Sequence, residues 1–230
     1  MEFAFTEEQE MIRDTAAAFL AEVSDSEAVR LAMATESGYD AALWQRICKE
    51  MYWQAIHLPE DHGGMGLGYV ELVATMEQMG RYLLCSPFYA TVCLAANALL
   101  IAGSETQKAR WLGRLCEGDT TATLAFNGGV VSWDASAVTA TWRRDGDGFL
   151  LNGDYRYVID GHTADLLVLA AREEGSAGAA GISLFLLPAG TEGLSRQWLP
   201  TMDQTRKQAA LTLQDVRLDE DALMGEAGSG

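Results

Sequence analysis

The sequence predicts an α+β fold, in which an all-helical amino-terminal domain is followed by a β-barrel-like middle domain. Capping boxes and apolar residues at steps of three and four recur in the first half of the chain, up to about Gly118. From Thr120 onward threonine, valine and alternating apolar residues dominate, and glycine turns are frequent. The expected domains are residues 1–118 and 119–222, with a linker stub at 223–230.

The helical part carries clear start signals. Thr6-Glu-Glu-Gln9 has the spacing of a capping box, and Ser104-Glu-Thr-Gln107 repeats it, so a helix is expected after each. Asp40 can cap a helix that contains Trp44. Apolar periodicity predicts two further helices, over about 70–83 and 91–101.

The β part begins with a hairpin signal. Asp145-Gly-Asp-Gly148 joins two β-rich runs, and aspartate and glycine tolerate the positive φ of tight hairpin turns. A second β pair is expected between Tyr155–Ile159 and Leu166–Ala171, with the turn at Asp160-Gly161. Later strands are expected at Ile182–Leu187, which Pro188 ends, at Trp198–Leu199 and at Leu211–Leu213.

Composition and charge argue against some classes of function. The chain has 230 residues, of which 49% are hydrophobic and 21% charged, as in ordinary globular proteins. Its 33 acidic and 16 basic residues give a net charge of −17, which argues against nucleic acid and anionic membranes as partners. We read no signal peptide and no run of about eighteen apolar residues that would span a membrane, so a cytoplasmic location is expected.

Other chemistry-bearing residues have plain structural interpretations. The four cysteines form no Cys-x-x-Cys pair and are expected as reduced thiols in or near the core. The three histidines are scattered, so no metal site is predicted. Gly64-Met-Gly-Leu-Gly68 is expected as a turn, because no strand precedes it and no Lys-Ser/Thr follows. Asp203 and Arg206 lie in a later loop and are consistent with a surface ion pair.

Several sequence blocks, in order, resemble the acyl-CoA dehydrogenase flavoprotein family. They are Phe5-Thr-Glu-Glu-Gln9, Leu58-Pro-Glu-Asp-His-Gly-Gly-Met-Gly66, Glu77-Gln-Met-Gly-Arg81, Gly103-Ser-Glu-Thr-Gln107 and the run from Asp134 to Arg172. The resemblance implies FAD as cofactor and an acyl-CoA thioester as substrate, in fatty acid or sterol side-chain metabolism. The family's carboxy-terminal helical bundle, which carries the glutamate base, has no counterpart in this sequence. No catalytic residue is therefore assigned.

The resemblance also assigns a flavin-facing site. The family's Thr-Glu-Pro-x-x-x-Ser-Asp loop falls on Asn127–Asp134, and its Gly-x-Lys-x-Trp-Ile-Thr-Asn-Gly turn falls on Gly153–Gly161. The cofactor-binding residues implied are Phe126, Asn127, Tyr157, Val158 and Ile159, and the substrate-binding residues are Ser132 and Trp133. Asn127 can donate and accept hydrogen bonds and Tyr157 can form an aromatic wall, whereas Ile159 offers no side-chain hydrogen bond. In the family, the loop that contains Asp203 and Arg206 lies near the cofactor or a neighbouring subunit, which is the alternative to a plain surface ion pair.

Two interpretations remain open at the sequence level. Trp133 stands where the family has a serine, so its indole either walls or plugs the pocket, or stacks on a substrate. The chain is either part of a flavin-dependent dehydrogenase whose base lies elsewhere, or a non-catalytic subunit that pairs with a catalytic one. Both imply a homo- or hetero-oligomer with another acyl-CoA dehydrogenase-like subunit. We also expect an exposed apolar face and association of the isolated chain.

Overall fold

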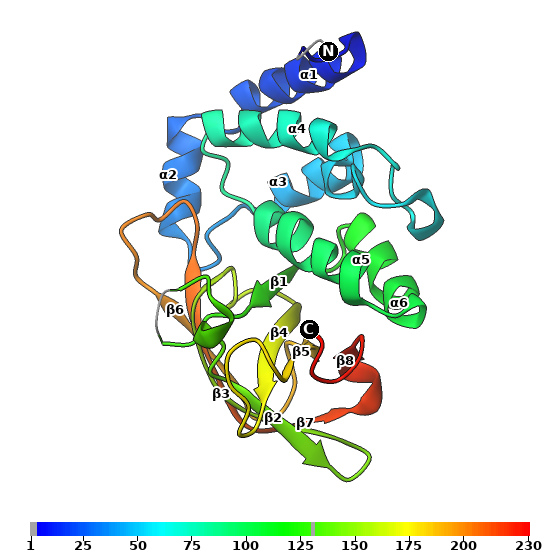
Figure 1. The fold of residues 1–230 in the computed structure, drawn as a ribbon. Helices are drawn as coiled ribbons and strands as arrows, with labels where there is room; N and C mark the ends of the chain where they lie inside the picture. Colours follow the sequence, from blue (N-terminus) through cyan, green and yellow to red (C-terminus); the bar gives the residue numbers. More distant parts are fainter. Residues whose placement is uncertain (1–3, 130–131) are drawn as a thin grey trace.

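The computed structural model describes residues 4–129 and 132–230, and it has the predicted order of a helical part followed by a curled, mixed β-sheet (Figure 1). Its main helices are α1 (Glu7–Val23), α2 (Ser26–Ala34), α3 (Ala41–Arg46), α4 (Tyr69–Arg81), α5 (Asn97–Ala102) and α6 (Glu105–Cys116). π-helical segments continue α3 and precede α5, at η1 (Ile47–Met51) and η4 (Tyr89–Ala96), and short turns η2 (Trp53–Ala55) and η3 (Glu60–His62) follow η1. The predicted α+β class is confirmed.

The helix starts follow the sequence signals. Thr6 and Ser104 both form complete capping boxes, in which the hydroxyl accepts from the third helical amide and the glutamine side chain returns the bond. Asp25 and Asp40 cap α2 and α3 with their carboxylates. The expected helix at 91–101 is a π-helical turn that runs directly into α5.

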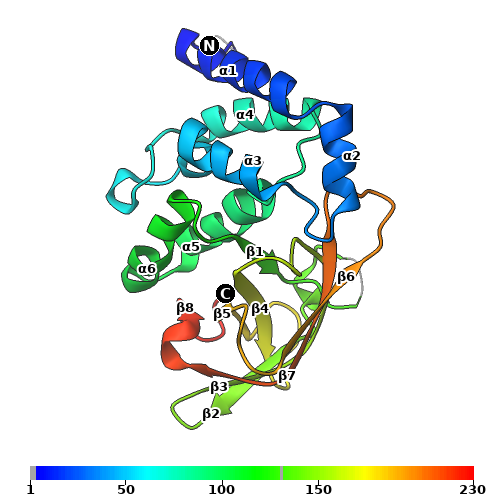
Figure 2. The same cartoon turned by 180° about the vertical axis from the view of Figure 1, so that it is seen from behind.

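The sheet contains β1 (Ala122–Ala125), β2 (Thr141–Asp145), β3 (Gly148–Ile159), β4 (Leu166–Glu173), β5 (Ile182–Pro188), β6 (Leu194–Leu199), β7 (Gln208–Asp219) and β8 (Leu223–Met224). The strand order is β6-β7-β3-β2-β4-β5-β8, and β1 pairs with β4. β4 pairs in parallel with β1 and β2, whereas the other neighbours are antiparallel. Seen from behind, the sheet curls on itself below the helices (Figure 2).

One predicted strand pair is wrong. The β2–β3 hairpin forms at Asp145-Gly-Asp-Gly148 as expected, but Tyr155–Ile159 does not pair with Leu166–Ala171. Tyr155–Ile159 is the second half of the long strand β3, and its partner is β7. The turn at Asp160 then carries the chain across to β4, whose neighbours are β1, β2 and β5. Local sequence shows the turn but not the partner, because the partner lies about fifty residues away.

The helices and the sheet share a hydrophobic core. One cluster lies inside the curled sheet around Tyr155, Phe149 and Phe185, and another lies among α1, α3 and α4. A third cluster joins the two parts, since it combines Leu99 and Trp111 with residues of β1, β4, β5 and β8. The helical layer therefore packs directly against one side of the sheet.

Polar contacts reinforce this junction. The Thr91 hydroxyl in η4 bonds both the amide and the carbonyl of Ala122 in β1, at 3.1 and 3.2 Å. The division into domains at residue 118 stays a prediction, although it falls between the end of α6 and the start of β1. The segment from Leu223 to Gly230 pairs with β5 through β8 and through the Gly230 amide, which donates to the Ile182 carbonyl. Within the described residues, no helix combines the length and apolarity needed to cross a bilayer.

Gly153 is a specific test of how tightly the sheet closes. It has a φ of 139°, and a Cβ built on it would lie 2.6 Å from the Cα of Ala140. Gly153→Ala is therefore expected to lower the free energy of unfolding by about 2–4 kcal/mol, measured by urea denaturation. Gly146→Ala is the matched control, because Gly146 also has a positive φ, 61°, but has nothing within 4 Å of its Cβ position. Equal losses in the two variants would contradict the close approach.

Candidate functional site

The seven site residues expected from the sequence lie around one cavity of about 270 Å³. Phe126 and Asn127 begin the loop that follows β1, and Tyr157, Val158 and Ile159 come from the end of β3. Ser132 and Trp133 lie at the rim of the cavity. Residues 130 and 131 of the same loop lie outside the described residues. The full lining is Tyr89, Leu94, Leu124, Ala125, Phe126, Asn127, Ser132, Trp133, Arg156, Tyr157, Val158, Ile159 and Gln208.

A β-bulge in β3 builds the wall of this cavity. Arg156 and Tyr157 together face the single residue Ala210 of β7, since Tyr155 pairs with Leu211 and Val158 with Ala209. Tyr157 has a φ of 59°, which is uncommon for a residue with a side chain. The Arg156 amide donates to the Asn127 carbonyl at 3.0 Å. The bulge thus joins the two segments of the site.

The residues around the bulge fix it from both sides. The Tyr155 side chain is buried, and its hydroxyl donates to the Ala170 carbonyl at 3.0 Å. Burial raises the pKa of Tyr155, so the hydroxyl remains a donor. Val158 lies in the sheet core, and the Thr123 hydroxyl donates to the Ile159 carbonyl at 2.6 Å. The two bulge residues, Arg156 and Tyr157, are left at the surface of the wall, and Tyr157 has 48% of its area exposed.

Asn127 carries an unsatisfied polar atom. Its side-chain oxygen Oδ1 is buried and has no hydrogen-bond partner among the described residues. Leaving such an acceptor unpaired costs about 1–3 kcal/mol, so a ligand N–H group at this position would be stabilised. The surrounding lining is mainly apolar and aromatic. This combination suits a flat heteroaromatic ring that presents an N–H donor on its edge.

Trp133 forms the rim and leaves the cavity open. Its side chain is 91% exposed and lies against Phe126, with ring centroids 5.7 Å apart and planes at 31°. The Asp134 amide donates to the Ser132 hydroxyl at 3.1 Å, which shapes the turn that presents Trp133. Behind this turn the buried Arg172 donates to the carbonyls of Ala135 and Val138.

Sequence reasoning missed six lining residues, which are Tyr89, Leu94, Leu124, Ala125, Arg156 and Gln208. Tyr89 and Leu94 belong to the π-helical segment η4, whose inward face cannot be read from a run that is apolar throughout. Gln208 enters because it pairs with Ile159 across β3 and β7. Only the pairing register between β3 and β7 shows that Gln208 lies beside the site residues.

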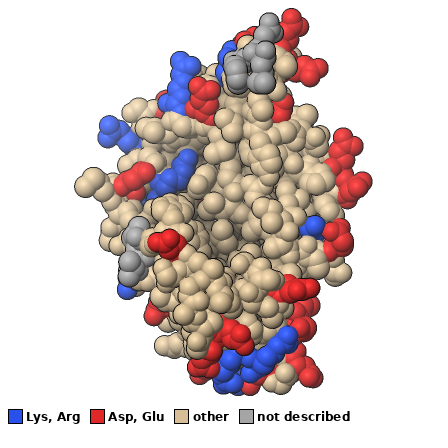
Figure 3. Space-filling view, viewed as in Figure 1, with Lys and Arg blue, Asp and Glu red and all other residues tan. Residues whose placement is uncertain are grey.

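The described lining contains no aspartate, glutamate or histidine, so it offers no carboxylate or imidazole for proton abstraction. No group of three His, Cys, Asp or Glu side chains within residues 4–129 and 132–230 is placed to hold a metal ion. All four cysteines are free, and burial raises the pKa of Cys48 to about 12. Figure 3 shows that the middle of one face carries few charged side chains, although the chain is strongly acidic.

Comparison with known proteins identifies the family. Residues 6–119 match the family model described as acyl-CoA dehydrogenase, N-terminal domain. Acyl-CoA dehydrogenase FadE12 of Mycobacterium tuberculosis H37Rv is 30% identical over 231 residues, which cover 97% of this chain and 58% of the relative. The chain belongs to the acyl-CoA dehydrogenase family.

Solved acyl-CoA dehydrogenases share the fold of the whole chain. Butyryl-CoA dehydrogenase from Megasphaera elsdenii superposes with a TM-score of 0.87 at 24% identity, over 100% of this chain and 61% of that one. A chain in the ChsE4-ChsE5 complex from Mycobacterium tuberculosis gives a TM-score of 0.85 at 25% identity, over 98% of this chain and 59% of that one. The sequence therefore spans less than two thirds of the length of each of these three relatives.

Replacing Trp133 tests whether it is a rim residue or a packed plug. Trp133→Ala is expected to change the free energy of unfolding by less than about 0.5 kcal/mol, because the side chain is exposed. Trp142→Ala is the control, since that indole is buried against Phe149 and Phe185 and donates to the Gly181 carbonyl. It should cost about 3–5 kcal/mol in the same urea titration. A loss above about 1.5 kcal/mol for Trp133→Ala would mean that the indole fills the pocket.

Proposed function

We propose that this chain forms the flavin-facing wall of an acyl-CoA dehydrogenase active site, in which FAD and an acyl-CoA thioester meet and the acyl chain is desaturated between its α and β carbons. The observation that carries this proposal is the convergence of Asn127 and Tyr157 on one cavity, with the Asn127 Oδ1 unpaired. When bound, FAD accepts the hydride that leaves the β carbon.

The residues present fit the edge and face of a flavin ring. The Asn127 side chain would accept from a ring N–H, and the exposed Tyr157 ring would pack against the ring plane. Ile159 contributes apolar surface only, because its side chain has no polar atom and its carbonyl is bonded to Thr123. Phe126 and Trp133 would line the side from which the thioester approaches.

The base that removes the α proton is proposed to come from elsewhere, either from a helical domain that follows this segment or from another subunit. The absence of a carboxylate among the described lining residues supports this. Exposed apolar residues also support a covering element. Tyr69, Val70 and Val73 of α4 are each about half exposed, and Ile101 of α5 is 84% exposed. The free cysteines support a proposed location in the reducing cytoplasm.

A second candidate is a non-catalytic subunit that pairs with a catalytic dehydrogenase in a hetero-oligomer. The exposed Trp133 and the apolar Ile159 favour it, because the family has hydroxyl residues at both positions. Similarity to a chain of the ChsE4-ChsE5 complex supports such an assembly. A structure described as the steroid ACAD Tcur3481-Tcur3483 adds support, with a TM-score of 0.83 at 27% identity.

Flavin absorption separates these functions. The chain is purified alone and together with the polypeptide encoded beside it, and each sample is titrated with acyl-CoA thioesters of increasing size without oxygen. Flavin that is retained and bleached only in the mixture would support a site shared between subunits. Retention and bleaching by the single chain would favour an active subunit. Colourless protein under every condition would refute flavin binding.

Asn127 provides the residue-level test. Asn127→Ala is expected to weaken FAD binding about fivefold, equivalent to about 1 kcal/mol, because one hydrogen bond to the ring is lost. Asn152→Ala is the control, since Asn152 lies outside the cavity lining and bonds Asp215. Its FAD affinity, measured by quenching of flavin fluorescence, should equal that of the unmodified chain. Equal affinities in all three proteins would remove Asn127 from the site.

A further inference from the structure

Asp160 lies directly after the wall of the cavity, at the junction of the sheet with the helices. It is only 6% exposed, and its carboxylate oxygen Oδ2 is buried without a hydrogen-bond partner among the described residues. The backbone, in contrast, is held firmly. The Asp160 amide donates to the Lys207 carbonyl at 2.9 Å, and its own carbonyl accepts from the amides of Thr163 and Ala164. The carboxyl is therefore kept in the junction by its backbone.

Two positively charged side chains near Asp160 donate hydrogen bonds to backbone carbonyl groups of the helical part. Arg206 donates from Nη1 to the Leu84 carbonyl at 2.6 Å. The salt bridges among the described residues do not include Arg206 with Asp203, so the surface ion pair, one of the two interpretations of these residues, is not formed. Lys207 is 3% exposed and donates from Nζ to the Met33 carbonyl at 2.8 Å. The two bonds join the segment before β7 to Leu84, in the turn after α4, and to Met33, in the last turn of α2.

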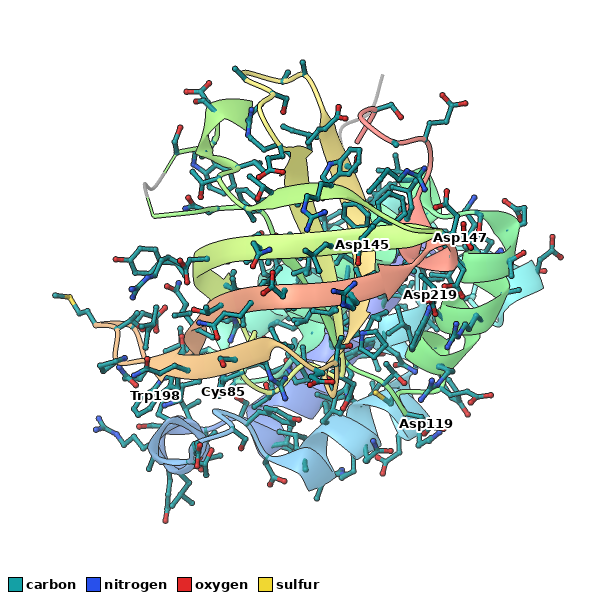
Figure 4. All side chains as sticks on the ribbon, turned by 90° about the horizontal axis from the view of Figure 1, so that it is seen from below. Cys85, Asp119, Asp145, Asp147, Trp198 and Asp219 are labelled. Carbon is teal, nitrogen blue, oxygen red and sulfur yellow. The ribbon has the colours of Figure 1, made fainter. Side chains whose placement is uncertain are left out.

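The other titratable groups at this junction come from several segments. Tyr39 follows α2 and Cys85 follows α4, and the charge of Asp160 acts on both. His162 and Asp165 belong to the turn of Asp160, and Asp203 lies in the segment with Arg206. Figure 4 shows Cys85 and Trp198 at one end of the sheet, whereas Asp145, Asp147 and Asp219 lie at the opposite end. The junction is thus separate from the acidic hairpin tip.

Ionisation of Asp160 is unfavourable in this setting. A buried carboxylate without hydrogen bonds loses its hydration, and burial raises the pKa of Asp160 from its ordinary value of 3.8 to about 7, while the nearby Arg206 lowers it. The carboxyl therefore exchanges its proton with solvent near neutral pH. The family pattern quoted above has asparagine here, which keeps the shape of the side chain and cannot ionise.

We propose that Asp160 is a positioning residue that couples the flavin-facing wall to the helical part through its state of protonation. When protonated, the carboxyl stays packed in the junction, and Arg206 remains bonded to Leu84. When the proton leaves to solvent, the carboxylate attracts the Arg206 guanidinium away from the Leu84 carbonyl. The charge of the carboxylate then acts on the amides of Tyr157 and Val158, because they belong to the same short stretch of backbone. The link to flavin, but not the coupling itself, rests on the proposed function.

The sign of the effect on stability follows from the raised pKa. Well below pH 4 the carboxyl is neutral in both the folded and the unfolded chain, so it adds no pH dependence. Between about pH 4 and pH 7 the unfolded chain has already lost this proton while the folded chain keeps it, and above this range both are ionised. The unmodified chain therefore loses stability over this range. Asp160→Asn should lack that loss, so its unfolding midpoint exceeds that of the unmodified chain at pH 8.5 more than at pH 5.5.

Amide chemical shifts test the coupling without any flavin. The full 230-residue chain is titrated from pH 5.5 to 8.5 by two-dimensional ¹H–¹⁵N NMR. The amides of Tyr157, Val158 and Cys85 are expected to move with one common midpoint near neutral pH. That midpoint should vanish in Asp160→Asn and rise in Arg206→Gln, because Arg206 favours the ionised form. Should Asp160→Asn fold poorly, the rise in Arg206→Gln still decides the question.

Asp215→Asn is the matched control. Asp215 also has a positive φ, 50°, but it is exposed and lies at the other bulge of β3 and β7. The common midpoint should persist in this variant. Wall amides that do not move, a midpoint unchanged in Arg206→Gln, or a midpoint that survives Asp160→Asn would each overturn the proposal. Failure of flavin binding would refute the proposed function and leave this result in place.

Discussion

The bulge in β3 is the constraint on which the candidate site depends. An uninterrupted strand would point Arg156 and Tyr157 to opposite faces and would use their backbone groups in pairing with β7. The extra residue instead releases the Arg156 amide, which bonds the Asn127 carbonyl. Two segments thirty residues apart are therefore held as one wall. The left-handed backbone of Tyr157 is the local strain that accompanies this arrangement.

The surrounding structure holds the bulge in place. Tyr155 before it and Val158 after it are both buried in the sheet core, so the extra residue cannot be absorbed by a slip in register. The Thr123 hydroxyl fixes Ile159, and the Asp160 amide is bonded to Lys207. The wall is consequently rigid on the side of the sheet and faces the cavity through Tyr157 and Asn127. Its remaining freedom lies at the junction with the helices, where Oδ2 of Asp160 has no hydrogen-bond partner in the described part of the chain.

Local features of the fold could be predicted from the sequence, because their causes are local. Thr6, Ser104 and Asp40 cap helices as expected, and the doubled Asp-Gly makes the β2–β3 hairpin. The strand that pairs with Tyr155–Ile159 could not be predicted, because a hydrophobic pattern indicates a strand but not its neighbour. The positive φ of Tyr157 was equally hidden, since nothing in a tyrosine signals a bulge.

The residues of the candidate site also divide into those that the sequence could identify and those that required the structure. The family resemblance brought Asn127 and Tyr157 into one site, and the geometry places both on one cavity, while their roles stay predictions. Gln208 and Tyr89 required the sheet register and the packing of η4. Trp133 shows that the shape of a pocket cannot be inferred from side-chain volume alone. The sequence left open whether its indole walls or plugs the pocket or stacks on a substrate, and the structure places the indole at the rim, exposed and against Phe126.

The central claim is that the bulge unites two segments into one flavin-binding surface. Its most direct test is to add FAD to the ¹⁵N-labelled chain and to map which amides change. The account predicts that Asn127, Tyr157 and Gln208 respond together with a single binding constant, whereas the hairpin tip at 145–148 does not. Changes confined to one of the two segments, or no change at any FAD concentration, would contradict it.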